Sequence, residues 1–181
     1  MVMPVPIHWT AQMVRDLPDD GNRYETVHGV LLVTPAPRTP HQLALGRLFL
    51  RIGHFLEAHP FGVPFFSPAD ISWSDDTLVQ PDMFVVSPEE ARGGWTTMRT
   101  LLLAVEVVSP SSRRADRVIK RTLYQQHGVR HYWVVDPKAQ QIEAWTPESR
   151  EPVIHRDTIT WKPLADQPGC TIAIPPLFAP I

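Results

Sequence analysis

The sequence has little cysteine and no long apolar run. Cys170 is the only cysteine among 181 residues, so the chain forms no internal disulfide. The first nine residues, MVMPVPIHW, lack the basic start and the apolar stretch of an export signal. The longest nearly uncharged apolar stretch, 101–108, is far shorter than the roughly 18 residues that cross a bilayer. These absences predict a cytoplasmic protein without a membrane span.

The sequence also lacks an excess of positive charge. Lysine and arginine together number 17 against 19 aspartates and glutamates, which gives a formal net charge of -2. That balance excludes a protein that coats nucleic acid non-specifically, so any contact with nucleic acid must be local. With 43% hydrophobic residues, we expect residues 1–181 to form one folded unit, with a helical lead-in at 1–20 and an apolar, proline-rich tail at 171–181.

The hydrophobic periodicity predicts an α/β fold. A short helix is expected after Thr10, a hairpin around Gly29, and an amphipathic helix from Pro40 to about residue 59. Strand-like runs follow at 63–73, 78–86, 101–108, 131–136, 141–145, 158–161 and 171–174. A helix at 113–127, ended by Gly128, separates two of these strands, which are therefore expected to be parallel.

Glu106 interrupts the run LLLAVEVV, which otherwise fits a strand buried on both faces. An unpaired buried charge is costly, so this carboxylate must be paired, protonated or bound to a cation. Two interpretations stay open. Glu106 is either part of a functional site or a structural acid, with an arginine partner or at a strand end open to water.

Asp82 follows Pro81 at the start of another apolar run. Proline is tolerated at the first residue of a strand, so Asp82 is expected near one end of the sheet. If Glu106 lies on a neighbouring strand, the two carboxylates form an oxygen site suited to Mg²⁺ or Mn²⁺. The alternative is a turn aspartate that caps backbone amides.

The segment 109–120 combines serines, a helix start and several basic residues. Ser111, Ser112 and Arg113 are suited to bind a phosphate at the helix N-terminus. Lys120 lies four residues after Asp116, where a solvated ion pair worth about 0.3–0.5 kcal/mol is the alternative to a functional role. Helical spacing places Lys120 on the flank of the apolar face rather than at its centre.

These pieces, in this order, resemble the PD-(D/E)XK phosphodiesterase superfamily and, more closely, its Uma2 (DUF820) branch of restriction-endonuclease-like proteins. Phosphate-loop, dinucleotide, nucleophile-elbow and zinc-protease signatures are absent from the sequence. The similar positions are 23–25, 29, 35–37, 41, 80–82, 106–112, 116, 120, 124, 128–129 and 132–137. The resemblance implies a restriction-endonuclease-like fold, with one mixed β-sheet flanked by helices.

The resemblance also implies metal-dependent hydrolysis of phosphodiester bonds in nucleic acid, with DNA as the expected substrate. Asp82 and Glu106 would be catalytic and hold Mg²⁺ or Mn²⁺. The superfamily places a lysine two residues after the acid, where this chain has Val108, so Lys120 is implied as its catalytic replacement.

Three further residues are candidates for the site. The resemblance implies Glu25 as the upstream acid that completes the metal shell, although a glutamate on a strand surface is the alternative. Asp70 is a weaker candidate for an outer shell, and His41 for a phosphate contact or a structural role at a helix start.

A second function, from a different class, is a catalytically weak or inactive protein that binds nucleic acid or a protein partner through the same scaffold. Val108 and the small net charge favour it. A nuclease that cuts both strands of a duplex is expected to act as a homodimer, with the apolar tail 172–181 as contact surface. The alternative is a tail that folds onto its own core.

Overall fold

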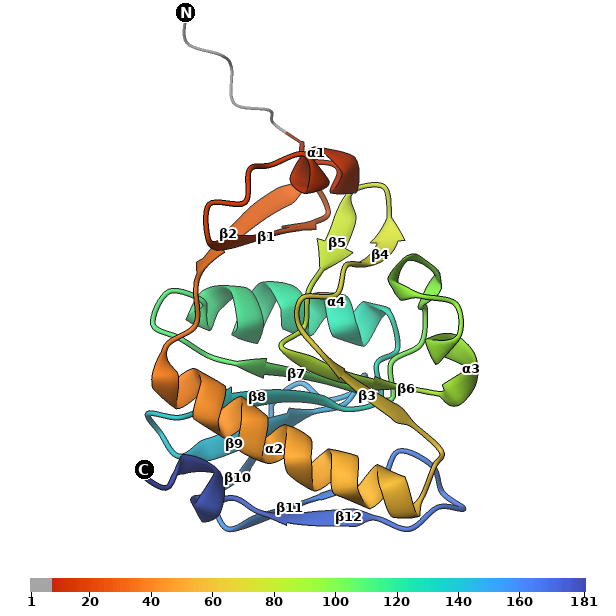
Figure 1. The fold of residues 1–181 in the computed structure, drawn as a ribbon, viewed down its shortest axis with the longest axis vertical. Helices are drawn as coiled ribbons and strands as arrows, with labels where there is room; N and C mark the ends of the chain where they lie inside the picture. The colour runs from red at the N-terminus through yellow and green to blue at the C-terminus, as the bar shows by residue number, and fades with distance from the viewer. Residues whose placement is uncertain (1–7) are drawn as a thin grey trace, which may run out of the picture.

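A computed structural model describes residues 8–181 (Figure 1). Residues 1–7 of the expected lead-in lie outside the described residues. The elements are α1 (Ala11–Arg15), β1 (Asn22–Val27), β2 (Val30–Pro35), α2 (Thr39–Ala58), β3 (Val63–Phe66), β4 (Ile71–Ser74), β5 (Thr77–Val79), β6 (Met83–Val86), α3 (Pro88–Ala91), η1 (Trp95–Thr97), β7 (Leu103–Val107), the π-helix η2 (Ala115–Lys120), α4 (Arg121–Gln126), β8 (Tyr132–Asp136), β9 (Gln141–Trp145), β10 (Val153–His155), β11 (Thr158–Trp161), β12 (Cys170–Ala173) and η3 (Pro175–Phe178).

A mixed six-stranded sheet confirms the expected fold class. Its strand order is β10-β9-β8-β7-β6-β3, and β7 and β8 are parallel as predicted, while the other neighbours are antiparallel. The helix α2 and the pair β11-β12 cover one face, and α4 covers the other (Figure 1). All five residues of β7 are buried, because this central strand is covered on both sides.

Two antiparallel sheets accompany the mixed sheet, so the strands do not all belong to one sheet. One has four strands in the order β2-β1-β5-β4 and lies above α4 in Figure 1, and the other is the pair β11-β12. The predicted hairpin is confirmed as β1 and β2, with Val27 opposite Val30. Its two-residue turn places His28 at φ 49° and Gly29 at φ 78°, as the twist of a tight hairpin requires.

Two of the expected strands are each divided between two sheets. Residues 63–73 form β3 in the six-stranded sheet and β4 in the four-stranded sheet, and residues 78–86 form β5 and β6 in the same way. A proline lies in each break, at Pro68 and Pro81. Proline donates no hydrogen bond to a sheet ladder, so pairing ends there although the apolar run continues.

The expected helix 113–127 is a π-helix followed by an α-helix. The backbone amide of Arg121 donates to the carbonyl of Asp116, five residues earlier. A π-turn is wider than an α-turn, so the angular spacing of an α-helix no longer applies to its side chains. The expectation that Lys120 lies on the flank of the apolar face is therefore wrong.

The apolar tail folds onto its own core. Ile174 and Leu177 are buried, and η3 packs against α2. Arg47 of α2 donates a hydrogen bond to the Leu177 carbonyl at 3.2 Å. The alternative of a tail that packs on its own core holds for these two side chains, whereas Ile181 at the end of the tail is 98% exposed. The tail as the contact surface of a homodimer stays a prediction. Within residues 8–181, no helix is long and apolar enough to cross a membrane.

Candidate active site

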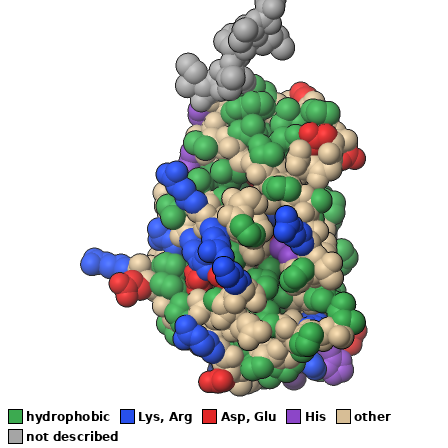
Figure 2. Space-filling view, turned by 90° about the vertical axis from the view of Figure 1, so that its left-hand side faces the viewer, with side chains coloured by type: hydrophobic (Ala, Val, Ile, Leu, Met, Phe, Trp, Pro, Cys, Tyr) green, Lys and Arg blue, Asp and Glu red, His purple; other side chains and the backbone are tan. Residues whose placement is uncertain are grey.

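A cleft of about 1210 Å³ lies where the four-stranded and six-stranded sheets meet. It is lined by the turn before β1, the link from β2 to α2, the ends of β6 and β7, and the loop after β7. Its basic lining residues are Arg15, Arg23, Arg38, Arg113 and Lys138. Figure 2 shows Lys and Arg side chains gathered across the middle of one face, with acidic and histidine side chains between them.

Asp82 lies on the floor of this cleft, in the break directly before β6. Its Oδ1 accepts a hydrogen bond from Arg23 Nη1 at 2.6 Å. Its Oδ2 accepts one from the Val107 amide of the neighbouring strand at 2.7 Å and lies 3.0 Å from His41 Nε2. Asp82 therefore caps an amide, as one interpretation held, and at the same time it contacts the side chains of Arg23 and His41 at the cleft.

Glu106 is completely buried in β7. Its Oε1 accepts hydrogen bonds from Lys120 Nζ and the Tyr124 hydroxyl, both at 3.0 Å. Its Oε2 is buried without a hydrogen-bond partner. The charged partner of Glu106 is thus a lysine rather than the arginine that the structural interpretation expected. One oxygen of the Glu106 carboxylate, Oε2, accepts no hydrogen bond.

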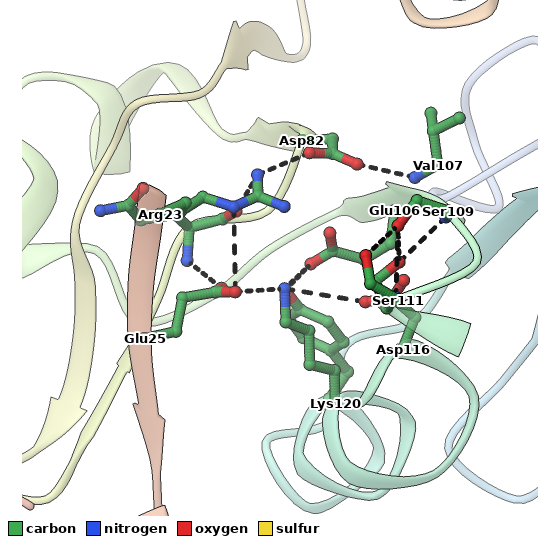
Figure 3. Close-up of polar contacts among 12 residues, drawn as sticks. Arg23, Glu25, Asp82, Glu106, Val107, Ser109, Ser111, Asp116 and Lys120 are labelled. Atoms are coloured by element: carbon green, nitrogen blue, oxygen red, sulfur yellow. Dashed lines mark hydrogen bonds and ion pairs between the residues drawn. The ribbon is translucent and has the colours of Figure 1, made fainter. Parts of the chain in front are cut away.

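Lys120 is the centre of this arrangement and is only 2% exposed. Figure 3 shows its ammonium group pointing between Glu25, Glu106 and Asp116. The Nζ atom lies 2.7 Å from Glu25 Oε2, 3.0 Å from Glu106 Oε1 and 3.8 Å from Asp116 Oδ1. We call these four residues the Lys120 cluster. The solvated pair with Asp116 that the spacing allowed is excluded, because both side chains are buried.

Glu25 connects the two sheets. It is completely buried, so it is not a glutamate on a strand surface. Its Oε1 accepts a hydrogen bond from the Gln80 amide, in the break between β5 and β6, at 2.7 Å. Its Oε2 faces Lys120. Glu25 therefore fixes the break between β5 and β6, and it extends from β1 of the four-stranded sheet to Lys120.

Arg23 is a site residue that was not singled out from the sequence. Besides its bond to Asp82, its Nη1 donates to the Gln80 carbonyl at 3.2 Å, and its Nε lies 3.9 Å from Glu25 Oε2. Arg23 and Glu25 are two positions apart on β1, so their side chains leave the same face of the strand. The opposite charges of Arg23 and Glu25 on one face of β1 are the sequence signal that could have identified Arg23 as a site residue.

The remaining candidates lie around the cleft rather than in the Lys120 cluster. His41, in the first turn of α2, contacts Asp82, whereas Asp70 accepts a hydrogen bond from Gln80 Nε2 at 2.7 Å and contacts no member of the cluster. Ser112 is buried and its Oγ accepts a hydrogen bond from the Ser109 amide. Ser111 and Arg113 are exposed at the cleft.

A family model described as “Putative restriction endonuclease”, Uma2, matches residues 11–175. The chain belongs to the Uma2 family. A solved structure of a “putative nuclease belonging to DUF820” from Anabaena variabilis ATCC 29413 is similar, with a TM-score of 0.75 and 19% identity over 94% of this chain and 97% of that one. No curated protein matches the chain. The structural similarity confirms the fold, and the family membership supports a nuclease.

Charge is unevenly compensated in this Uma2 site. Four buried carboxylates, those of Glu25, Asp82, Glu106 and Asp116, meet two permanent cations, Arg23 and Lys120. Burial raises the pKa of Glu106 well above its usual value, and the neighbouring Asp82 charge adds to the rise, although Lys120 opposes it. Burial likewise raises the pKa of Asp116 to about 6 against the opposing charge of Lys120.

Asp82 and Lys120 are held in their charged forms. Burial disfavours the Asp82 carboxylate, but the His41 hydrogen bond and the Arg23 charge outweigh burial and lower its pKa. Burial also disfavours the Lys120 ammonium, but Glu106 and Glu25 outweigh it and raise the pKa of Lys120. The site therefore combines a stable anion at the cleft, a stable cation behind it, and two carboxyls that resist ionisation.

The donor chemistry fits a divalent cation. Carboxylate oxygens are what Mg²⁺ and Mn²⁺ prefer, and Glu106 Oε2 is a buried oxygen without a partner. If all four carboxylates are ionised, they exceed the two permanent cations by two charges. In the arrangement that the described residues adopt, no three His, Cys, Asp or Glu side chains are grouped to hold a metal. Asp82 and Glu106 would hold the ion once the side chains now paired with them move.

Proposed function

We propose that this protein hydrolyses phosphodiester bonds in nucleic acid, with Mg²⁺ or Mn²⁺ held by Asp82 and Glu106 and with DNA as the substrate. One observation carries the proposal. Asp82 lines an open cleft with a basic lining, and its Oδ2 binds the amide of Val107, the residue next to Glu106 on β7. Glu106 is buried behind the cleft and pairs there with Lys120 of η2. Membership of the Uma2 family supports the same conclusion.

Each protein group has a role that its position allows. The divalent cation supplies a bound water of lowered pKa and neutralises charge on the phosphate. Lys120 stays protonated, because carboxylates surround it, and it stabilises the negative charge that develops in the transition state. Tyr124 and Lys120 both hold Glu106 Oε1, which orients the second oxygen of that carboxylate.

The lining of the cleft fits a nucleic-acid backbone. Arg38, Arg113 and Lys138 lie around its rim, and Ser111 is exposed on the loop after β7. Arginine and serine are frequent donors to phosphate oxygens. These contacts are few and local, which agrees with the net charge of -2 and indicates binding through one cleft rather than over the whole surface.

Calorimetric titration with Mn²⁺, together with cleavage of plasmid DNA, tests this function. The wild type should bind Mn²⁺ and cleave only with a divalent cation, and Glu106→Gln should lose both properties. Asp19→Asn is the matched control, because Asp19 is an exposed carboxylate that lines the same cleft. Retained Mn²⁺ affinity in Glu106→Gln would show that Glu106 is a structural acid instead.

A second candidate function is a scaffold that binds nucleic acid without cutting it. One observation favours it: Asp82 and Glu106 are already paired with Arg23 and Lys120, and residues 8–181 present no ready group of three metal ligands. Gel-shift titration in EDTA and in Mn²⁺ distinguishes the two functions. A scaffold should bind DNA equally well in both and leave it intact.

The nuclease proposal extends to assembly. A duplex has two strands, and a single cleft faces one of them at a time, so we propose that two copies act together. The exposed end of the tail, with Ile181 98% exposed, is available as contact surface, whereas Ile174 and Leu177 are buried in the core. Light scattering at tens of micromolar should give twice the chain mass of 20.5 kDa, and a monomer mass would refute pairing.

A further inference from the structure

Arg23 pairs with an oxygen of Asp82 that would have to be free for Asp82 to bind a metal ion. Its Nη1 lies 2.6 Å from Asp82 Oδ1, the shortest of the charged contacts around Asp82. The guanidinium is 19% exposed at the side-chain level and lines the cleft. Its Nε atom is buried without a hydrogen-bond partner. Arg23 is thus bound tightly at one end, yet it leaves one of its own donors unused.

The two oxygens of Asp82 are not equivalent. Oδ2 is tied to the fold, because it accepts the Val107 amide at 2.7 Å and contacts His41 at 3.0 Å. Moving Oδ2 would leave the amide of a buried strand end unpaired, which is costly. Oδ1 contacts Arg23 instead. It is therefore the oxygen that Asp82 can offer to a cation without disturbing β7.

A guanidinium and a divalent cation compete for the same oxygen. Both are positive, so they repel each other strongly in a partly buried site where water screens poorly. The Nη1 of Arg23 also donates to the Gln80 carbonyl at 3.2 Å, a contact that Arg23 can keep when a cation takes Asp82 Oδ1. The exchange needs a change of side-chain conformation and leaves the strand β1 in place.

We infer that Arg23 is a resident counter-cation of Asp82 Oδ1, which a divalent metal ion must displace in order to bind. This inference rests on the proposed function, because it takes Asp82 as a metal ligand. It assigns to Arg23 the role of setting the metal affinity: the side chain keeps the metal-free site compensated and weakens metal binding by competition. Arg23 is a positioning residue in this scheme, since it acts through Asp82.

Mn²⁺ titration of the full chain by calorimetry, without nucleic acid, measures the competition directly. Arg23→Gln keeps a hydrogen-bonding side chain but removes the charge, so its Mn²⁺ dissociation constant should fall by at least about tenfold. Arg15→Gln is the matched control. Arg15 lines the same cleft and pairs with Asp70 at 3.6 Å instead of with Asp82, and its loss should change the affinity by less than about twofold.

A second variant keeps the inference testable if Arg23→Gln does not fold. Circular dichroism and thermal unfolding show whether Arg23→Gln folds. If it does not, Arg23→Lys decides, because it keeps the charge but is a shorter side chain without the guanidinium group that lies between Asp82, Gln80 and Glu25. Its affinity for Mn²⁺ should rise by about threefold, less than for the neutral variant. An affinity equal to that of the wild type would overturn the inference.

The outcomes separate this inference from the proposed function. Tighter binding in Arg23→Gln that Asp82→Asn abolishes supports both. Wild-type binding that depends on Asp82 but is unchanged in Arg23→Gln overturns the inference and leaves the proposed function standing. An equal gain in Arg15→Gln also overturns it, because the effect is then a general one of net charge. No Mn²⁺ binding by the wild type or any variant overturns both.

Discussion

The π-helix η2 carries two ion-pair clusters that differ in composition. On one side the Lys120 cluster places a single ammonium among three buried carboxylates. On the other, Arg117 pairs with Asp136 and Glu143, and we call these three residues the Arg117 cluster. Arg117 donates to both Glu143 oxygens at 2.6–3.0 Å and to Asp136 Oδ2 at 2.8 Å, while its side chain stays 27% exposed.

This difference in composition distinguishes an ion-pair cluster that stabilises the fold from a candidate functional site. In the Arg117 cluster the planar guanidinium of Arg117 is hydrogen-bonded to two carboxylates, which is the arrangement expected of a stabilising ion pair. The Lys120 cluster leaves Glu106 Oε2 unpartnered and raises the pKa values of Glu106 and Asp116. Groups that are bound only for stability do not need such a surplus of charge, whereas strongly shifted groups next to a cleft are typical of functional sites.

Removing the cation of the Lys120 cluster should have the largest effect. Lys120→Met leaves three buried carboxylates without their ammonium, so the free energy of unfolding should fall by about 3–5 kcal/mol. Cleavage should fall by at least about a hundredfold, and Lys120→Arg should not restore it. Urea unfolding and plasmid cleavage measure the two effects. Lys162→Met is the control and should change neither, because Lys162 is an exposed lysine that does not line the cleft.

Removing one carboxylate from each cluster should have opposite effects. Glu143→Gln breaks the paired fork of Arg117 and should lower the free energy of unfolding by about 1–3 kcal/mol. Glu106→Gln replaces a buried carboxyl whose ionisation is disfavoured with a neutral amide of similar shape, and it should leave stability unchanged or higher. Urea midpoints of the two variants test this. Equal losses of stability in both variants would mean that the Lys120 cluster stabilises the fold in the same way as the Arg117 cluster.

The smallest effects should appear in the pH dependence of stability. Asp116 has a raised pKa of about 6 in the fold, so its contribution is complete below about pH 4 and is lost as the pH rises through 6. Burial opposes ionisation of Asp136, but the Ala139 amide and Arg117 outweigh burial and lower its pKa. Its contribution is therefore present above about pH 4 and is lost as the pH falls.

Two variants separate these contributions. Relative to Asp116→Asn, the wild type should lose stability between pH 4 and pH 6. Relative to Asp136→Asn, it should lose stability only below about pH 4. Urea unfolding at pH 3, 4, 5, 6 and 7 gives both differences, and parallel curves for the two variants would contradict the assignment.

The sequence predicted the parts of the fold that follow from local periodicity. The amphipathic helix α2 and the parallel pair β7 and β8 are confirmed, because each has one clear apolar pattern. The division of 63–73 and 78–86 between two sheets was not predicted, since the apolar alternation runs on through both prolines. Pairing partners are long-range and leave little trace in a local pattern.

The sequence singled out the acids of the candidate site and, through the family resemblance, Lys120, but not the inward position of Lys120 or the role of Arg23. Glu106 and Asp82 stand out because a carboxylate beside an apolar strand is unusual. The inward position of Lys120 depends on the π-turn, which changes the helical phase without a distinctive sequence signal. Arg23 on β1 was not singled out, because its partner Asp82 is 59 positions away in the sequence.

The separation of these partners along the chain orders the assembly of the site. Lys120 and Glu106 are only 14 positions apart, so their pair closes a short loop, whereas Arg23 and Asp82 close a loop of 59 positions. Long loops cost more chain entropy, and such contacts form after local ones. The cleft is therefore completed only when the four-stranded sheet docks on the rest, and a nascent or partly unfolded chain lacks the pairing of Arg23 with Asp82.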